Sequence, residues 1–257
     1  MQEFFCGFKM MYFKKSMASY QEYTLRSSVA PKRWVHKKRF KQAIKLLELK
    51  PEDTLLDYGC GGGYLLELAG KIVPPDRLYG FDPSESMRKL ATENLAGKTK
   101  IFANVDELRG MKFTKIACLE TLEHLPDELL HEALNTISNL LAENGKVLIS
   151  VPVEIGLSAV VKNTFRAVFG NLRHLTLKTF TRTALGLPCE REIPQDFDGL
   201  PFIYSHICFD YRRFEKILSE VFKIKKRVFS PVPALGPVLN NIVFFVCEKP
   251  NRHSNSQ

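Results

Sequence analysis

A glycine-rich stretch, Asp57-Tyr58-Gly59-Cys60-Gly61-Gly62-Gly63, is the segment of this sequence best suited to hold a ligand. It lies between a short apolar segment and a helical pattern at 64–69. Glycines at such a turn permit positive φ angles and let a ligand approach the backbone closely, and the N-terminus of the following helix attracts anions. A dinucleotide-binding G-x-G-x-x-G motif counted from Gly59 needs a glycine at position 64, where this sequence has Tyr64. The spacing therefore favours a different ligand.

Two carboxylates accompany this turn. Asp57 stands two residues before Gly59, where a carboxylate repels a pyrophosphate but accepts hydrogen bonds from a cationic amino-acid end. Asp82 comes 25 residues after Asp57, at the end of the next apolar segment, and is placed to bind both hydroxyls of a ribose. The pair predicts a ligand with an amino-acid part and a nucleoside part.

The D-x-G-x-G-x-G motif and the later acid resemble those of the class I S-adenosylmethionine-dependent methyltransferases, over roughly residues 30 to 156. The resemblance implies a Rossmann-like fold and S-adenosylmethionine as cofactor. It also implies that the glycine turn lines the methionine end, that Asp82 holds the ribose and that the loop after the third strand flanks the adenine. The family often has Asp and a small residue in that loop, whereas Asn104-Val105-Asp106 stands here, so either Asn104 or Asp106 is expected to pair with the adenine. The predicted cofactor-binding residues are Asp57, Gly59, Gly61, Gly63, Asp82, Asn104, Val105 and Leu119.

Glu120, Glu123 and His124 follow the fourth apolar segment, at the edge of the predicted sheet where ligands of such folds bind. The spacing is similar to that in ubiquinone-biosynthesis O-methyltransferases, in which two glutamates and a histidine are associated with a divalent ion. Such ligands suit Mg²⁺, Mn²⁺ or Zn²⁺, and the cation would acidify a substrate hydroxyl. Without a metal, His124 is a candidate general base. A purely structural role is the third interpretation, because methyl transfer depends mainly on alignment and desolvation.

His206 is the most distant candidate. It stands where the chain returns from a predicted insertion, either lining the acceptor pocket or capping Asp210. We therefore expect Glu120, His124 and His206 to be the catalytic residues, and Glu120, Glu123 and His124 to be the candidate metal ligands.

The elements that must position these residues follow from an alternation of short apolar segments and helical patterns. This alternation predicts an α/β fold with a doubly wound, mostly parallel, seven-stranded sheet. The expected strands are 54–57, 77–82, 100–103, 115–119, 146–151, 223–229 and 241–247. The expected helices include 128–141, ended by Asn144-Gly145, and 210–221.

The chain divides into a basic helical segment at 1–50, a methyltransferase domain at 51–249 and a polar tail at 250–257. A lid is predicted as an insertion at about 157–205. Residues 157–191 carry 6 Lys and Arg against 1 Glu, among many apolar residues. This pattern is typical either of a lid that buries its aromatic and aliphatic side chains or of a lid that also binds an anionic membrane surface. A lid of the first kind would bury Phe165, Val168, Phe169 and Phe180.

Six cysteines without a C-x-x-C pair favour a reducing compartment, and no apolar stretch approaches the ~20 residues that span a bilayer. The sequence thus predicts a cytoplasmic protein, with membrane association as the alternative. Lys32 to Lys41 combine charge and aromatic residues, but no RNA-binding module is visible, so nucleic acid is not expected as a partner.

The predicted function is methyl transfer from S-adenosylmethionine to a small-molecule or lipid-linked acceptor, at oxygen. The alternatives are nitrogen acceptors, protein or RNA substrates, and a catalytically silent binding or scaffold subunit. The ionisable residues beside the glycine turn favour an enzyme, since a scaffold has no need of them.

Overall fold

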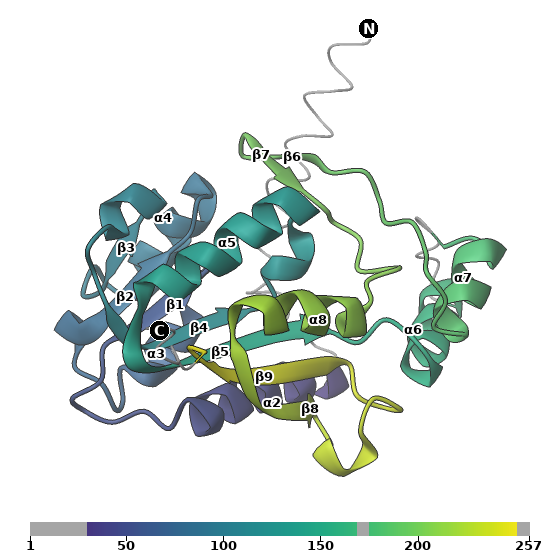
Figure 1. Cartoon of the computed structure of the whole chain (residues 1–257), viewed down its shortest axis with the longest axis horizontal. Helices are drawn as coiled ribbons and strands as arrows, with labels where there is room; N and C mark the ends of the chain where they lie inside the picture. Colours follow the sequence, from purple (N-terminus) through teal and green to yellow (C-terminus); the bar gives the residue numbers. More distant parts are fainter. Residues whose placement is uncertain (1–29, 169–174, 251–257) are drawn as a thin grey trace, which may run out of the picture.

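A seven-stranded sheet forms the centre of the computed structural model, which describes residues 30–168 and 175–250 (Figure 1). The strand order is β3-β2-β1-β4-β5-β9-β8, and β9 is antiparallel to both of its neighbours. The strands are β1 (Leu55–Tyr58), β2 (Leu78–Phe81), β3 (Lys100–Phe102), β4 (Phe113–Leu119), β5 (Leu141–Pro152), β8 (Lys223–Ser230) and β9 (Ile242–Glu248). The predicted fold class is therefore confirmed, strand by strand.

Helices cover both faces of the sheet, and each face has its own apolar core. On one face lie α2 (Ala30–Leu47) and α3 (Tyr64–Ala69), and on the other α5 (Asp127–Leu140) and α8 (Tyr211–Val221) (Figure 1). Helix α4 (Glu85–Asn94) packs beside β3 and α3. Short 3₁₀ turns complete the frame: η1 (Pro75–Arg77), η2 (Val105–Leu108), η3 (Leu122–His124) and η4 (Pro233–Leu235).

Side-chain caps fix the start of two of these helices. The Ser84 hydroxyl accepts a hydrogen bond from the Met87 amide at 3.3 Å, and the Asp210 carboxylate accepts one from the Arg212 amide at 2.9 Å. Because Asp210 itself caps α8, the structure does not support the interpretation of His206 as its partner.

The helix predicted at 128–141 is present, but the prediction that Asn144-Gly145 ends it is wrong. Helix α5 ends at Leu140, and Asn144-Gly145 lies inside β5. The pairing of β4 with β5 moves from Phe113 opposite Leu141 to Lys115 opposite Lys146, so the residues between them form a bulge. A turn signal in the sequence does not distinguish a helix terminus from a strand bulge.

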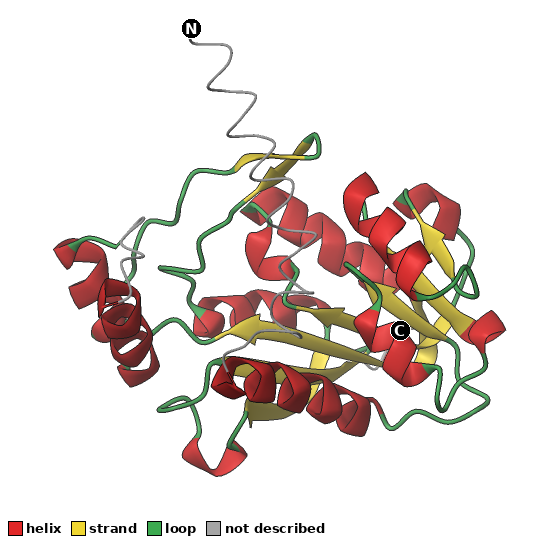
Figure 2. Cartoon of the chain, turned by 180° about the vertical axis from the view of Figure 1, so that it is seen from behind, coloured by secondary structure: helices red, strands yellow, loops and turns green. Residues whose placement is uncertain are grey.

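The insertion after β5 contains more structure than the sequence predicted. It comprises α6 (Leu157–Val168), α7 (Leu177–Ala184) and a hairpin of β6 (Gln195–Phe197) and β7 (Leu200–Phe202). Figure 2 shows the two helices set apart from the sheet, and the hairpin carried on long loops. We call residues 189–208 the strap.

A disulfide between Cys189 and Cys208 closes the strap, with Cα atoms 5.1 Å apart. This pairing departs from the expectation of reduced thiols, which rested on the absence of closely spaced cysteines. The two residues are 19 positions apart and meet only because the hairpin turns the chain back. The other cysteines of the described part, Cys60, Cys118 and Cys247, are free and buried.

The predicted burial of the lid's side chains is wrong at Phe165 and Val168. Phe165 and Val168 are 62% and 73% exposed, and Phe180 is half-buried. Phe169 lies outside the described residues. So do residues 1–29 of the basic segment and residues 251–257 of the tail. Helical spacing identifies a stripe of apolar residues but does not say whether that stripe faces the domain.

Two of the lid's cations form ion pairs with Glu154, just after β5. Lys162 Nζ lies 2.8 Å from Glu154 Oε1, and Arg166 Nη1 lies 2.9 Å from Glu154 Oε2. Burial alone would raise the pKa of Glu154, but the two neighbouring cations outweigh it and hold the pKa at about 2. The positive charge counted in this segment is therefore partly neutralised, which the count within 157–191 could not reveal.

Within the described residues, none of the helices has the length and apolar character that crossing a membrane requires.

Candidate functional site

The glycine turn between β1 and α3 has the backbone that its sequence predicts. Gly59, Gly61 and Gly63 all have positive φ angles, and the amides of Gly59 and Cys60 both donate to the Phe81 carbonyl, at 2.7 and 3.0 Å. A Cβ at position 59 would lie 2.4 Å from Cγ2 of Thr121. Glycine is thus required at position 59 for two reasons, its φ angle and its contact with the turn after β4.

Asp82 ties this turn to the end of β2. Its Oδ2 accepts a hydrogen bond from the Gly61 amide at 2.8 Å, and its Oδ1 accepts one from the Ser84 amide at 3.0 Å. Burial raises the pKa of Asp82, although both amides oppose that effect. A carboxylate oxygen has two lone pairs, so each oxygen keeps one for a ribose hydroxyl. The ribose contact itself stays a prediction.

Asp57 lines a small cavity at the carboxyl end of β1, with Gly59 and Leu119. Burial, together with the charge of Asp82, raises the pKa of Asp57 to about 7. Arg39 of α2 borders the same cavity, and its Nε is buried without a hydrogen-bond partner. The site therefore offers one acid and one guanidinium to a zwitterionic amino-acid group. Arg39 was missed in the sequence, where it is one of many cations in a basic helix.

The loop after β3 carries the predicted adenine contacts. Val105 begins η2, and the Asn104 amide donates to Glu107 Oε1 at 3.0 Å. Asp106 pairs with Arg109 at 2.9 Å, and both side chains are largely exposed. Asn104 is also exposed and takes part in the capping box of η2, so the adenine contact stays a prediction for both residues.

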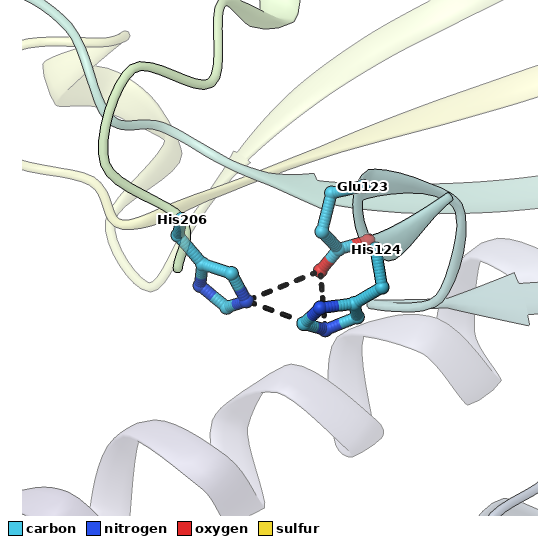
Figure 3. Close-up of side chains that lie close together, drawn as sticks. All are labelled: Glu123, His124 and His206. Carbon is cyan, nitrogen blue, oxygen red and sulfur yellow. Dashed lines mark hydrogen bonds and ion pairs between the residues drawn. The ribbon is translucent and has the colours of Figure 1, made fainter. Parts of the chain in front are cut away.

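Glu123, His124 and His206 form a cluster beyond the turn after β4, and their side chains point toward one another (Figure 3). Glu123 Oε1 lies 3.8 Å from His124 Nε2 and 3.9 Å from His206 Nε2, and the two Nε2 atoms are 3.3 Å apart. The Glu123 side chain is fully buried, and neither of its oxygens has a hydrogen-bond partner. The structure thus brings together His124 and His206, which are 82 positions apart in the sequence.

Glu120 does not join this cluster. It has a φ of +54°, accepts a hydrogen bond from the Ser150 hydroxyl at 3.0 Å, and lies 3.8 Å from Arg39. Among the described residues, the His, Cys, Asp and Glu side chains close enough to share a metal ion are Glu123, His124 and His206. This group differs from the predicted metal-ligand set, which contained Glu120 in place of His206.

The ring of His124 is oriented by the strap. Its Nδ1 lies 2.7 Å from the Ile203 carbonyl, which only accepts hydrogen bonds, so the neutral ring carries its proton on Nδ1 and a lone pair on Nε2. Phe202 stacks on the ring at 4.3 Å. Burial lowers the pKa of His124 to about 4 and that of His206 to about 3, whereas burial raises the pKa of Glu123.

Further contacts hold the strap over the site. Arg191 donates to the Glu123 carbonyl, and the Ile203 amide donates to the His124 carbonyl at 2.8 Å. At the tip of the hairpin, Asp198 accepts a hydrogen bond from the Ser84 hydroxyl at 2.7 Å, next to Asp82. The strap therefore reaches from the start of α4 to the turn after β4. No local pattern indicates these contacts, because each joins residues more than 60 positions apart.

A doubly wound sheet of this strand order, with a glycine turn after β1 and an acid after β2, is the architecture of class I methyltransferases. A family model described as a methyltransferase domain matches residues 32–190, more than half of the chain. The chain belongs to this family, and the prediction of a class I S-adenosylmethionine-dependent methyltransferase is confirmed.

Two curated relatives match shorter stretches. A demethylmenaquinone methyltransferase of Desulfitobacterium hafniense is 41% identical over 70 residues, which are 27% of this chain and 27% of the relative. The mitochondrial ubiquinone biosynthesis O-methyltransferase of Saccharomyces cerevisiae is 31% identical over 100 residues, which are 36% of this chain and 32% of the relative. The matches thus span about a third or less of either relative.

Solved structures extend the similarity of fold to nearly the whole chain. The magnesium protoporphyrin IX methyltransferase of Synechocystis, solved with bound S-adenosylhomocysteine, has a TM-score of 0.56 at 17% identity, covering 94% of this chain and 100% of that one. The N-methyltransferase NodS of Bradyrhizobium japonicum, also with S-adenosylhomocysteine, has a TM-score of 0.53 at 14% identity, covering 88% and 90%.

Proposed function

We propose that this protein is an S-adenosylmethionine-dependent methyltransferase whose acceptor is a small or lipid-linked molecule, methylated at oxygen. The observation that carries the proposal is the pair of buried acids, Asp57 and Asp82, at the carboxyl ends of neighbouring strands around a glycine turn. Residues 51–249 would be the catalytic domain, with 157–205 as its lid.

Each residue around the glycine turn would have a distinct partner on the cofactor. Asp57 would accept hydrogen bonds from the ammonium group and Arg39 would donate to the carboxylate. Asp82 would hold the ribose, and Asn104 and Val105 would flank the adenine. When bound, the cofactor supplies a methyl group on a positively charged sulfur. The protein's part is to align the acceptor with that group and to exclude water.

The strap supplies an aromatic wall beside His124. Phe202 lies 5.3 Å from Phe197 and 4.9 Å from Tyr204, measured between ring centroids. Such a wall suits an acceptor that contains a ring. The Saccharomyces cerevisiae relative is a ubiquinone biosynthesis O-methyltransferase and the Synechocystis protein is a magnesium protoporphyrin IX methyltransferase, and both names support an acceptor of this kind. Nitrogen acceptors, protein or RNA substrates, and a silent scaffold are the alternatives.

We expect the full chain to bind S-adenosylhomocysteine and to transfer label from radioactive S-adenosylmethionine to a component of fractionated cell extract. Gly61→Arg is the blank, since a side chain at this positive φ angle would fill the turn beside Asp82. Calorimetry measures the binding and an acceptor screen measures the transfer. Absence of binding by a folded wild-type chain would refute the proposal. Binding without product, with one partner protein always co-purifying, would favour the scaffold.

A second proposal concerns the lid, where we infer that α6 and α7 present an apolar surface to a lipid bilayer. Leu157, Val161 and Leu177 are 52%, 53% and 81% exposed. Eight of the thirteen exposed large apolar residues in the described part lie at 157–193. Because Lys162 and Arg166 are bound to Glu154, apolar contact rather than charge would dominate.

We expect the double variant Val161→Ser, Leu177→Ser to bind anionic liposomes at least about tenfold more weakly. Its two new serine side chains lack the apolar surface that the bilayer would remove from water. Co-sedimentation at low and high salt measures the binding. The side chain of Ile72 is 36% exposed and lies outside the lid, so Ile72→Ser is the matched control. Negligible binding by the wild type would leave a lid that only excludes water.

A further inference from the structure

The buried carboxylate of Glu123 lacks the partners that such a group needs. The side chain is fully buried, and neither Oε1 nor Oε2 makes a hydrogen bond. Burying an unpaired carboxyl group is unfavourable, so buried acids are hydrogen-bonded, ion-paired or bound to a metal. The Nε2 atoms of His124 and His206 lie near Glu123 Oε1 but beyond hydrogen-bond distance, and the charges of Arg191 and Arg39 also act on the carboxylate.

These three side chains have the arrangement of a ligand set. Their ligand atoms all lie within 4.8 Å of one another, a spacing that permits one ion to contact all three. The hydrogen bond between His124 Nδ1 and the Ile203 carbonyl leaves the Nε2 lone pair directed to the cluster. Metal-binding histidines are commonly oriented by such a bond from their other nitrogen. The side chain of His206 is 30% exposed, so an ion can reach the site from solvent.

The composition of the set selects the kind of metal. The resemblance to ubiquinone-biosynthesis O-methyltransferases implied two glutamates and one histidine, but Glu120 is bound to Ser150 and lies beside Arg39. With His206 in its place, the donors are two imidazole nitrogens and one carboxylate oxygen. Imidazole suits Zn²⁺, Fe²⁺ and Co²⁺, whereas Mg²⁺ prefers oxygen.

We infer that Glu123, His124 and His206 bind one divalent transition-metal ion, and that Glu120 takes no part. Three protein ligands leave coordination positions open, and an ion held in this way acidifies a hydroxyl that binds to it. His206 belongs to the strap, whereas Glu123 and His124 belong to η3. The ion would therefore fasten the strap to the turn after β4. The inference rests on this geometry and not on the proposed methyl transfer.

The test is equilibrium dialysis of the metal-stripped full chain against Zn²⁺, followed by the visible absorption of Co²⁺ bound in its place. The wild type is expected to bind one equivalent and to give the bands of Co²⁺ with nitrogen ligands. His206→Ala and Glu123→Gln are expected to bind at least tenfold more weakly. Glu120→Gln, a matched change of a neighbouring acid, is expected to bind as the wild type does.

Two further measurements keep the result interpretable. Circular dichroism of each variant establishes that it is folded, and His206→Asn, which is closer in size, replaces His206→Ala if that variant is not. An excess of Mg²⁺ should not displace Zn²⁺. The inference is overturned if the wild type binds no stoichiometric metal, if Glu120→Gln loses as much affinity as the His206 variant, or if Mg²⁺ competes equally. Calorimetry with S-adenosylhomocysteine is independent of all three results, so failure here is distinguishable from failure of the proposed function.

Discussion

Replacing Asp82 with alanine is expected to weaken the binding of S-adenosylhomocysteine about 1000-fold, because two charge-assisted hydrogen bonds to the ribose, together worth about 4 kcal/mol, are lost. The same substitution removes the acceptor of the Gly61 and Ser84 amides, so the glycine turn also loses its link to β2. Both effects act in one direction, since a looser turn holds the ligand less well. Titration calorimetry at constant salt measures the change.

Two variants separate the ligand contact from the support of the turn. Asp82→Asn keeps a side-chain oxygen but lacks the charge, and should fall between the wild type and Asp82→Ala. Asp76→Ala removes an exposed acid in η1, just before the same strand, and should leave the affinity unchanged. A loss of less than about tenfold in Asp82→Ala would show that this carboxylate only supports the loop, since the two hydrogen bonds lost would be expected to cost more.

Local sequence sufficed to predict that Asp57, Gly59 and Asp82 lie together at one edge of the sheet, for a physical reason. Parallel neighbouring strands bring their carboxyl ends to one edge, so residues at or just after the ends of β1 and β2 lie close together. The glycine spacing required the positive φ angles that the structure has. Asp57, Gly59 and Asp82 could therefore be placed from their distance to a strand end alone.

The residues around Glu123 could not be placed in this way. Glu120 and Glu123 follow the same strand and look equivalent in the sequence, but the positive φ angle at Glu120 directs that side chain to Ser150. His206 reaches the site because a hairpin and a disulfide fold the strap back. Arg39 reaches the cavity lined by Asp57 because α2 packs on the sheet. Each is a long-range contact, which no local pattern encodes.

The raised pKa of Asp57 should make the binding of S-adenosylhomocysteine depend on pH. Burial raises this pKa to about 7, so the side chain is largely protonated at pH 6 and largely charged at pH 8. Only the charged form pairs with the ammonium group of the ligand. The dissociation constant of S-adenosylhomocysteine is therefore expected to rise up to about tenfold for each pH unit below 7, and to level off above it. Calorimetry across this range measures the profile.

Asp57→Asn isolates this effect from other titrating groups, including Asp82, whose pKa is also raised. The variant should bind about 50-fold more weakly than the wild type at pH 8, through the loss of roughly 2 to 3 kcal/mol of charge-assisted bonding. Its affinity should change much less with pH. If both proteins gave the same profile, Asp57 would not be the group that pairs with the ammonium.

Stability without ligand should change in the opposite direction. The folded-state pKa of Asp57 lies above its ordinary value of 3.8, so its contribution to folding is present in full below pH 3.8 and is lost as the pH rises through about 7. The loss is at most about 4 kcal/mol, since each pKa unit corresponds to about 1.4 kcal/mol. Asp57→Asn should therefore unfold at higher denaturant concentration than the wild type at pH 8, but not at pH 4. A charge that destabilises the empty fold and strengthens ligand binding is what a binding carboxylate, rather than a structural one, requires.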